Sequence, residues 1–422
     1  MDHLRLLSCL VVIISFIVTS GCDRCLEPRE SPKGYVPPVI VESVALPVRD
    51  ADGIALGDLT GNGKIDILTS EGKHGTVIWF EQGNHWREWK KHHIYTIGRE
   101  RKEIEGNALG DLVSDGRLEA LSLDQPNGDI YLHKHSGNPR GHWETAIIRS
   151  GRPLLQDVMI NDVDGDGRQD IVYTWQGRNA GEGGVHWLKL TGDNPLDAAH
   201  WTDYVMATHE SAWWLVPKRL DLSGNGEATD IVFTARDTER RNPASKPGLF
   251  WLEPNTDVSR PWKKHTIDTL LPHPKQVDAG DLSGRGHGKD LVVATISESI
   301  YWYEFSKNWK RHEITMPVIG GSRPNRIWNV TIMRLGGQRE GIIAPVLNRS
   351  DRRGALLFFE FLDGRFEPTV LRNIDYGHPM DDRMVLHDVT GDGQAEIFVP
   401  DSGISVDLLH IIRLGRNNRK NF

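Results

Sequence analysis

A short acidic stretch, residues 162 to 170, carries the clearest chemical signal in this chain. It has carboxylates at loop positions 1, 3, 5 and 9, which are Asp162, Asp164, Asp166 and Asp170. Acids so close together repel each other unless a hard cation or backbone N–H groups lie among them. Position 12 is Tyr173 in a strand-like run, whereas an EF-hand has Glu there, followed by a helix. We therefore expect a Ca²⁺ loop that leads into a strand, with the Arg168 carbonyl as a further ligand.

The acidic stretch recurs along the chain every 50 to 60 residues or so. Clear copies begin at Asp58, Asp111, Asp221, Asp281 and Asp388, and a worn copy lies at residues 333 to 340. Each copy follows one strand and precedes three: an apolar strand, a strand with an aromatic cluster, and a strand in which Trp precedes alternating basic residues. Seven copies of four strands predict an all-β fold, a seven-bladed β-propeller.

The two ends of the repeat array indicate how the ring closes. Residues 39 to 46 precede the first loop and resemble an outer strand, whereas the last repeat ends without one. We predict that this N-terminal strand completes the last blade, which removes an open sheet edge. The expected boundaries are a signal or lipobox-like segment at 1–22, a linker at 23–38, the propeller at 39–415 and a basic tail at 416–422.

The repeat resembles the FG-GAP/VCBS type, the propeller type also found in the head of integrin α-subunits. The calcium-loop pattern of that type is Asp-x-Asp-x-Asp-Gly-x-x-Asp, which residues 162 to 170 match at every fixed position. The resemblance implies structural Ca²⁺ as the cofactor. It covers residues 39 to 415 and specifies the fold more closely than the function.

The other loops differ in how many oxygen ligands they offer. The first supplies Asp58, Thr60, Asn62 and Asp66, and the last supplies Asp388, Thr390, Asp392 and Glu396. The second loses a ligand at Val113, and the fifth has Arg285 where a guanidinium could replace a cation. The alternative for every loop is an Asp-rich turn whose carboxylates are satisfied by its own backbone N–H groups.

The N-terminus indicates export. Arg5 precedes an apolar run at residues 6 to 18, which is short for a membrane span and typical of a signal peptide. Gly21-Cys22 follows and resembles a bacterial lipobox, so we expect Cys22 to carry a lipid that anchors the chain to a membrane, in the periplasm or at the cell surface. An ordinary signal peptide or an uncleaved anchor are the alternatives. The three cysteines all lie in or beside this segment, so the body forms no disulfide.

A ligand site is expected on the face opposite the acidic loops. Without the acids of those loops the chain is net basic, and cationic and aromatic residues concentrate in the loops of the other face. The candidate ligand-binding residues are Arg178, Trp213, Trp214, Arg236, Arg240, Lys275, Arg326 and Arg352. Such side chains suit a polar or anionic ligand, a glycan or a protein. Alternatively, the arginines are only solvated and the tryptophans pack beneath the loops.

Two functions fit these features. The first is a monomeric, non-enzymatic binding or scaffold module, because no Gly-x-Ser-x-Gly, His-Glu-x-x-His or P-loop motif occurs. The net charge of −8 argues against a nucleic-acid partner. The second is a lyase or sugar dehydratase, because fungal aldos-2-ulose dehydratases contain a similar propeller. The catalytic groups would then be His273, His378, Asp381 and Asp382, with Arg323 or Arg326 stabilising an anion.

Overall fold

The computed structural model describes residues 35–179, 181–236, 246–297, 299–306, 308–317, 319, 326–336, 339–348, 353–375, 383–402 and 407–416. The chain divides into two compact units, Met1–Tyr35 and Val36–Phe422. The fold below is that of the second unit. Cys22 and the rest of the targeting segment lie outside the described residues. No helix in the described part of the chain has the length and hydropathy of a membrane span.

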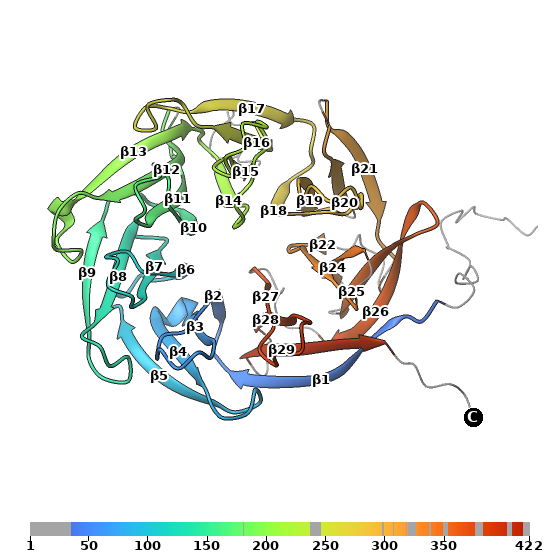
Figure 1. The fold of residues 1–422 in the computed structure, drawn as a ribbon, viewed down its shortest axis with the longest axis horizontal. Helices are drawn as coiled ribbons and strands as arrows, with labels where there is room; N and C mark the ends of the chain where they lie inside the picture. Colours follow the sequence, from blue (N-terminus) through green and yellow to red (C-terminus); the bar gives the residue numbers. More distant parts are fainter. Residues whose placement is uncertain are drawn as a thin grey trace, which may run out of the picture. The chain divides into compact units, whose positions relative to one another are not determined.

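Seven antiparallel sheets surround a common centre, as the sequence predicts (Figure 1). Their strands, from the innermost outwards in blades 1 to 5, have the following bounds. Blade 1 has β2 (Ala51–Gly57), β3 (Asp66–Glu71), β4 (Thr76–Gln82) and β5 (Trp89–Thr96), and blade 2 has β6 (Ile104–Gly110), β7 (Glu119–Asp124), β8 (Asp129–His135) and β9 (Trp143–Arg149). Blade 3 has β10 (Leu155–Asn161), β11 (Asp170–Gln176), β12 (Gly183–Leu190) and β13 (Trp201–Thr208). Blade 4 has β14 (Ala212–Leu215), β15 (Ile231–Ala235), β16 (Gly248–Glu253) and β17 (Lys263–Asp268), and blade 5 has β18 (Pro274–Gly280), β19 (Asp290–Thr295), β20 (Ser299–Glu304) and β21 (Lys310–Thr315).

Blades 6 and 7 depart from this simple order. Blade 6 contains β22 (Arg326–Ile327), β23 (Thr331–Arg334), β24 (Glu340–Asn348), β25 (Arg353–Leu362) and β26 (Arg365–Asp375). Its innermost strand is in two pieces, β22 and β23, which both pair with β24. Blade 7 contains β27 (Val385–His387), β28 (Glu396–Ser402) and β29 (Asp407–Arg416), with β1 (Pro38–Pro47) outermost. Two short 3₁₀ turns, η1 (Gly72–His74) and η2 (Ala198–His200), complete the described elements.

The ring closes as predicted. Strand β1 pairs antiparallel with β29 from Pro38 opposite Arg416 to Pro47 opposite Leu408, so the two ends of the propeller lie side by side (Figure 1). The predicted span of 39–46 differs from β1 by one residue at each end. This pairing covers an edge that would otherwise offer unpaired N–H and C=O groups to another chain.

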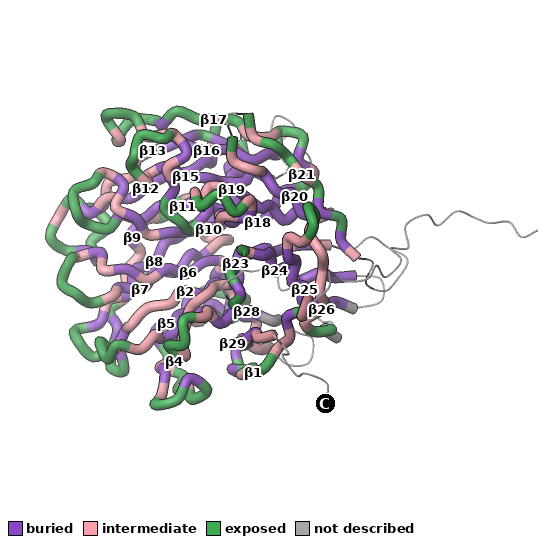
Figure 2. Tube along the Cα trace, turned by 45° about the vertical axis from the view of Figure 1, so that its right-hand side comes forward, coloured by how far each residue is buried: buried purple, intermediate pink, exposed green. Residues whose placement is uncertain are grey.

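Burial follows the position of each strand in its blade. All residues of the second strands β3, β7 and β11 are buried, whereas the residues of the outer strand β5 are half-buried or exposed except for Ile94. Exposed residues accordingly lie along the outer strands and loops (Figure 2). Seven apolar clusters fill the spaces between adjacent blades; one joins Leu121 and Leu132 of blade 2 to Ile171 of blade 3. Each blade is therefore buried against two neighbours, which is how a thin sheet obtains a core.

Strand direction separates the two faces of the ring. Each inner strand ends at an acidic loop, so these loops share one face, and the loops between second and third strands lie on the other. In the third loop Gly165 and Gly167 have φ of 74° and 84°. Glycine adopts this left-handed backbone without the steric cost of a Cβ, and it turns the acids toward one another.

Candidate functional site

A cavity of about 490 Å³ lies at the centre, where the inner strands of all seven blades meet. Much of its wall is apolar, including Ile54, Leu109 and Val277. Polar groups enter from several blades and from the residues next to the inner strands. They include Asn107 from β6, Asp157 from β10, Trp214 from β14, Lys218, Gln276 and Asp278 from β18, Thr331 from β23 and Arg383. An apolar cavity with a few fixed polar groups is the usual form of a small-ligand site.

An ion pair spans this central cavity. Arg383, which precedes β27 of blade 7, donates from Nη2 to Asp157 Oδ2 at 2.5 Å and to the Leu215 carbonyl at 2.6 Å. Asp157 belongs to blade 3 and Leu215 to blade 4, the two blades farthest from blade 7 in a ring of seven. The Arg383 side chain therefore bridges the channel. Asp157 lies near the start of β10 and Arg383 precedes β27, so this ion pair lies toward the face opposite the acidic loops, whereas Leu215 ends the short strand β14.

Asp157 acts as a brace in this arrangement. Its Oδ1 accepts the Val158 N–H at 2.9 Å, and its Oδ2 accepts the Leu215 N–H at 2.8 Å in addition to Arg383. Burial raises the pKa of Asp157, and the Arg383 charge opposes that shift. With three donors on one carboxylate, Asp157 has little capacity left for a ligand.

A second carboxylate in the cavity wall is similarly committed. Asp278 Oδ2 accepts the Ile332 N–H at 2.8 Å and the Thr331 hydroxyl at 3.1 Å, which ties blade 5 to blade 6. Its Oδ1 accepts the Ala279 N–H at 2.8 Å and lies 2.7 Å from Lys218 Nζ of blade 4. These two acids of the cavity wall, which also contains Glu105, therefore hold blades together.

Two buried donors of the wall have no acceptor within the described residues. They are Gln276 Nε2, on a side chain that is 2% exposed, and Trp214 Nε1, on one that is 3% exposed. Gln276 Oε1 is already used, because it accepts the Val330 N–H at 3.2 Å. A buried N–H without an acceptor costs on the order of 1 to 3 kcal/mol. An oxygen-bearing ligand or water in the cavity would remove that cost.

Several predicted ligand residues lie together beside the cavity as a cation–π stack. Lys275 Nζ lies 4.2 Å from the centre of the Trp328 ring, 5.6 Å from Trp213 and 5.8 Å from Trp214. Arg236 lies 4.4 Å from Trp213, and the Arg383 guanidinium lies 5.4 Å from Trp214. Trp213, Trp214 and Lys275 are all buried. Cations therefore contact the indole rings of both predicted ligand residues, and of Trp213, Trp214 and Lys275 only Trp214 lines the cavity.

The remaining predicted residues of this face are dispersed. Arg178 lines a separate cavity in blade 3, and Arg326 begins β22 without lining the central cavity. His273 is exposed, has a positive φ of 43° and lines neither cavity. The other candidates, Arg240, Arg323, Arg352, His378, Asp381 and Asp382, lie outside the described residues. The structure therefore does not bring His273 to the polar groups of the channel.

Sequence reasoning missed the acids of the channel wall. Asp157 and Asp278 stand inside strands in which all but one residue is buried. A charged residue in such a strand must find partners on folding, and that signal could have identified both. Their partners Arg383 and Lys218 are distant in sequence and could not be assigned from it.

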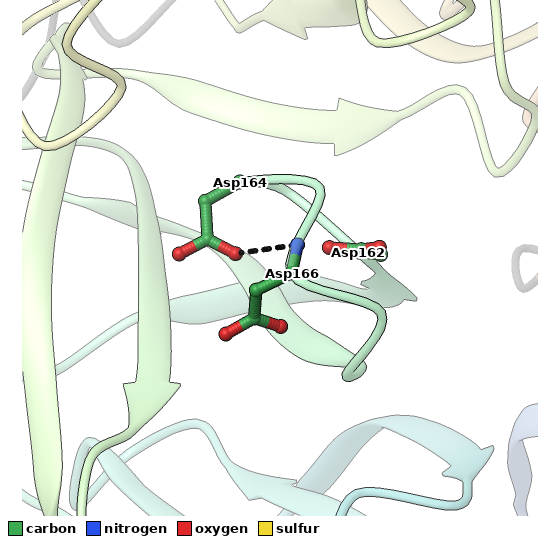
Figure 3. Close-up of side chains that lie close together, drawn as sticks. All are labelled: Asp162, Asp164 and Asp166. Atoms are coloured by element: carbon green, nitrogen blue, oxygen red, sulfur yellow. Dashed lines mark hydrogen bonds between the residues drawn. The ribbon is translucent and has the colours of Figure 1, made fainter.

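On the opposite face, the third acidic loop brings three carboxylates together (Figure 3). Oxygens of Asp162, Asp164 and Asp166 lie within 4.8 Å of one another, so this triad could hold a metal ion. The fourth predicted ligand, Asp170, is buried and accepts the Val163 N–H at 3.0 Å. Burial raises the pKa of Asp170 to about 7, with neighbouring acids adding to the shift. The Arg168 N–H donates to Asp166 Oδ1 at 2.9 Å.

An ammonium group already contacts this triad. Lys189 Nζ, from β12, lies 2.7 Å from Asp166 Oδ2 and also contacts Asp164. Its hydrogen bond is the main cause of a lowered pKa at Asp166. A metal ion bound by all three carboxylates would have to displace this lysine.

In the first and last loops the acids accept hydrogen bonds from backbone N–H groups of their own turn, the alternative to a metal site. Asp58 accepts the Asn62 and Gly63 N–H groups at 3.1 and 2.6 Å, and Asp388 accepts those of Gly391 and Gly393 at 2.7 and 2.6 Å. The position-9 acids are buried and also bind backbone. Asp66 accepts the Leu59 and Thr60 N–H groups at 3.0 and 3.2 Å, and Glu396 accepts the Val389 N–H at 3.0 Å. The other predicted ligands make hydrogen bonds within their own loops. Asn62 and Asp392 accept the N–H groups of Lys64 and Gln394. The Thr60 and Thr390 hydroxyls donate to Asp58 and Asp388.

In the six clear repeats, position 5 of the loop varies together with one position of the third strand. The strand position is the residue after the one that pairs with the first apolar residue of the second strand. In blade 3, Leu188 pairs with Ile171, so the position is Lys189. Where position 5 is Asp115, Asp166 or Asp392, the strand residue is Lys134, Lys189 or Arg413, and each pair is in contact. Where position 5 is Asn62, Asn225 or Arg285, the strand residue is Glu81, Glu253 or Glu304. Arg285 contacts Glu304, so charge is complementary in both directions.

Known proteins share the fold but do not identify a family. No protein family and no curated protein matches the sequence. Among solved structures, BBS1N in complex with ARL6DN, soaked with mercury, aligns at TM-score 0.51 and 10% identity over 92% of this chain and 99% of that chain. The WD40 β-propeller domain of Doa1 aligns at 0.49 and 10% identity, over 90% and 97%. The PQQ-bound aldose sugar dehydrogenase of Streptomyces coelicolor aligns at 0.42 and 12%, over 91% and 100%. Identities this low show the β-propeller fold alone.

Proposed function

We propose that this chain is an exported β-propeller that binds an oxygen-rich polar or anionic ligand, a carbohydrate, in its central cavity and catalyses no reaction on it. The observation that carries the proposal is the pair of buried donors, Gln276 Nε2 and Trp214 Nε1, that line the cavity without an acceptor in the described part of the chain. The hydroxyl and ring oxygens of a saccharide would accept from both donors.

Two of the three acids that line the cavity are committed to other bonds, which favours binding over catalysis; the third is Glu105, and His387 lines the cavity as well. A general acid or base must exchange a proton with substrate. Asp157 and Asp278 each hold backbone N–H groups and a cation, so either would have to break bonds between blades before it could act. The alternative, a lyase or sugar dehydratase using His273, His378, Asp381 or Asp382, is tested in the same assay by product analysis.

The proposed setting is extracytoplasmic, with a lipid on Cys22 as the membrane anchor and a monomeric propeller outside the membrane. A Ca²⁺ ion that displaced Lys189 from the third loop would be structural in this proposal. That loop follows the C-terminal end of β10, whereas Asp157 and the channel bridge lie near the start of the strand. The ion would therefore not touch the ligand.

Binding of the full chain to a glycan array and to a panel of polyuronides, with analysis of products, tests the proposal. Trp214→Phe removes one donor and keeps the ring, and Gln276→Glu removes the other while keeping the acceptor for Val330. We expect each change to weaken binding at least tenfold, the effect of losing about one good hydrogen bond. Trp251→Phe, in β16 and away from the cavity, is the matched control. Equal binding by all four proteins would refute the proposed site, and turnover would favour the enzyme.

A further inference from the structure

A second cavity, of about 490 Å³, lies in blade 3 and shares no lining residue with the central one. Its walls come from the connection between β9 and β10, the loop between β11 and β12, and the outer strand β13. It belongs to the face opposite the acidic loops. Arg178, one of the arginines singled out in the sequence, lines this cavity.

Asp203 on β13 organises the side chains around this cavity. Its carboxylate accepts the Tyr173 hydroxyl at 3.0 and 3.1 Å, Arg149 Nε at 2.8 Å and Arg152 Nη2 at 3.0 Å, and lies 3.2 Å from His186 Nδ1. Burial alone would raise the pKa of Asp203, but His186 and the two arginines lower it to about 2. Asp203 is therefore ionised and fully used, so it positions Arg152 and His186 and binds no ligand itself.

Two donors that line this cavity have no acceptor within the described residues. Arg152 Nε is buried, and its guanidinium stacks 4.9 Å from the centre of the Trp175 ring. Trp175 Nε1 is buried as well, on a side chain that is 6% exposed. Each N–H needs an oxygen partner that the described protein does not supply. A ligand with acceptor oxygens close to the Arg152 guanidinium would satisfy both donors.

His186 and Arg178 add the remaining chemistry. His186 Nδ1 faces Asp203, which leaves the other ring nitrogen, Nε2, for a hydroxyl of a ligand. Arg178 is exposed at the rim, and no described carboxylate forms an ion pair with its guanidinium. Glu182, on the same loop, is occupied by the Arg178 and Asn179 N–H groups. The cavity therefore offers cationic donors for an oxyanion and a ring nitrogen for a hydroxyl, and the carboxylate that lines it, Glu182, accepts from the backbone of its own loop.

We infer that the blade-3 cavity is a second binding site, which takes a hydroxylated carboxylate such as a uronic acid residue. The carboxylate faces Arg152, Arg178 and the Trp175 N–H, and a hydroxyl pairs with His186 Nε2. The volume of about 490 Å³ is in the range of pockets that hold one or two sugar units. The Trp175 face is covered by Arg152, so this site selects by charge and hydrogen bonds and not by stacking a sugar on the ring.

The test is calorimetric titration of the full chain with D-glucuronate and, separately, D-glucose. The variant Trp214→Phe serves as the background, so that the central cavity contributes least to the signal. Arg178→Gln and Trp175→Phe in that background each remove one contact from the blade-3 site. Arg168→Gln, an exposed arginine on the opposite face, is the matched control. Thermal melting of each protein confirms that it folds.

We expect glucuronate to bind at least tenfold tighter than glucose, and binding to fall at least tenfold in Arg178→Gln and in Trp175→Phe but not in Arg168→Gln. Glucuronate binding that Arg178→Gln and Trp175→Phe leave unchanged would overturn the inference, as would equal affinity for glucose. Absence of glucuronate binding would also overturn it and would mean that water alone satisfies the donors. Glucuronate binding by the wild type that is lost in the Trp214→Phe background would place the ligand in the central cavity. That result would overturn the inference and support the proposed function alone.

Discussion

Replacing Lys189 with methionine tests whether an internal ammonium, and not a metal ion, neutralises the third acidic loop. The change keeps the length of the side chain and removes its charge. Lys189 contacts Asp164 and lies 2.7 Å from Asp166, and Asp162 completes the triad. If the Lys189 ammonium neutralises the triad, the wild-type loop is stable without metal, whereas the loop of Lys189→Met needs a cation.

The distances set the size of the effect. At 4.8 Å, the upper limit of the separations in the triad, two carboxylates repel by roughly 1 kcal/mol in bulk water and by about 3 kcal/mol at an effective dielectric constant of about 20. The Asp164 and Asp166 side chains are 17% and 37% exposed, so solvent screens much of this repulsion. We expect a loss of about 1 to 2 kcal/mol, which lowers Tm by roughly 1 to 3 °C in a protein of this size. Ca²⁺ at about 100 times its Kd would restore about 2.7 kcal/mol.

The assay is thermal unfolding in chelator and in millimolar CaCl₂, together with metal analysis after dialysis. Lys134→Met is the matched control, because Lys134 holds Asp115 in the same way but that loop has Val113 at position 3. We expect Ca²⁺ to stabilise Lys189→Met and not Lys134→Met or the wild type. Stoichiometric Ca²⁺ in the wild type, with a Tm that falls on chelation, would refute this reasoning and support calcium.

Three further predictions concern stability. Arg383→Met leaves Asp157 buried without its cation and should lower the free energy of unfolding by about 3 kcal/mol. Adding Asp157→Asn should recover part of that loss. If the effects of the two changes are fully additive in the double mutant, the bridge across the channel is refuted. His133 is buried between the Ser122 and Thr145 hydroxyls, and burial lowers its pKa to about 3, so the unfolded chain binds a proton at this residue first as pH falls below 6.5. The free energy of unfolding of the wild type should therefore fall by on the order of 1 kcal/mol per pH unit from about pH 6 to pH 4. In measurements of Tm against pH, His133→Gln should show a flatter slope over this range. Deleting residues 36 to 47 removes β1 and exposes the edge of β29, so chromatography should show association of a less stable protein, and a monomer with an unchanged Tm would contradict the closure argument.

Much of the fold could be predicted because each repeat carries its own local signals. The acidic turn, the buried second strand and the Trp-basic outer strand recur at regular spacing, so the blade number, strand order and closure by β1 follow from the sequence. The broken inner strand of blade 6 was not predicted, because its loop is the worn copy. The pairing of Lys189 with Asp166 could have been found by aligning third strands, since Lys134 and Arg413 stand at the equivalent place.

The candidate site depends on contacts that no local pattern encodes. Asp157 and Arg383 are 226 residues apart and meet only because a ring of seven blades places blade 7 across the channel from blades 3 and 4. The stack of Lys275 against Trp213, Trp214 and Trp328 likewise unites blades 4, 5 and 6. Turns and strand periodicity are properties of neighbouring residues, so the blade can be predicted from the sequence. Which polar groups share the channel depends on the closure of the ring, because closure sets the distances between blades.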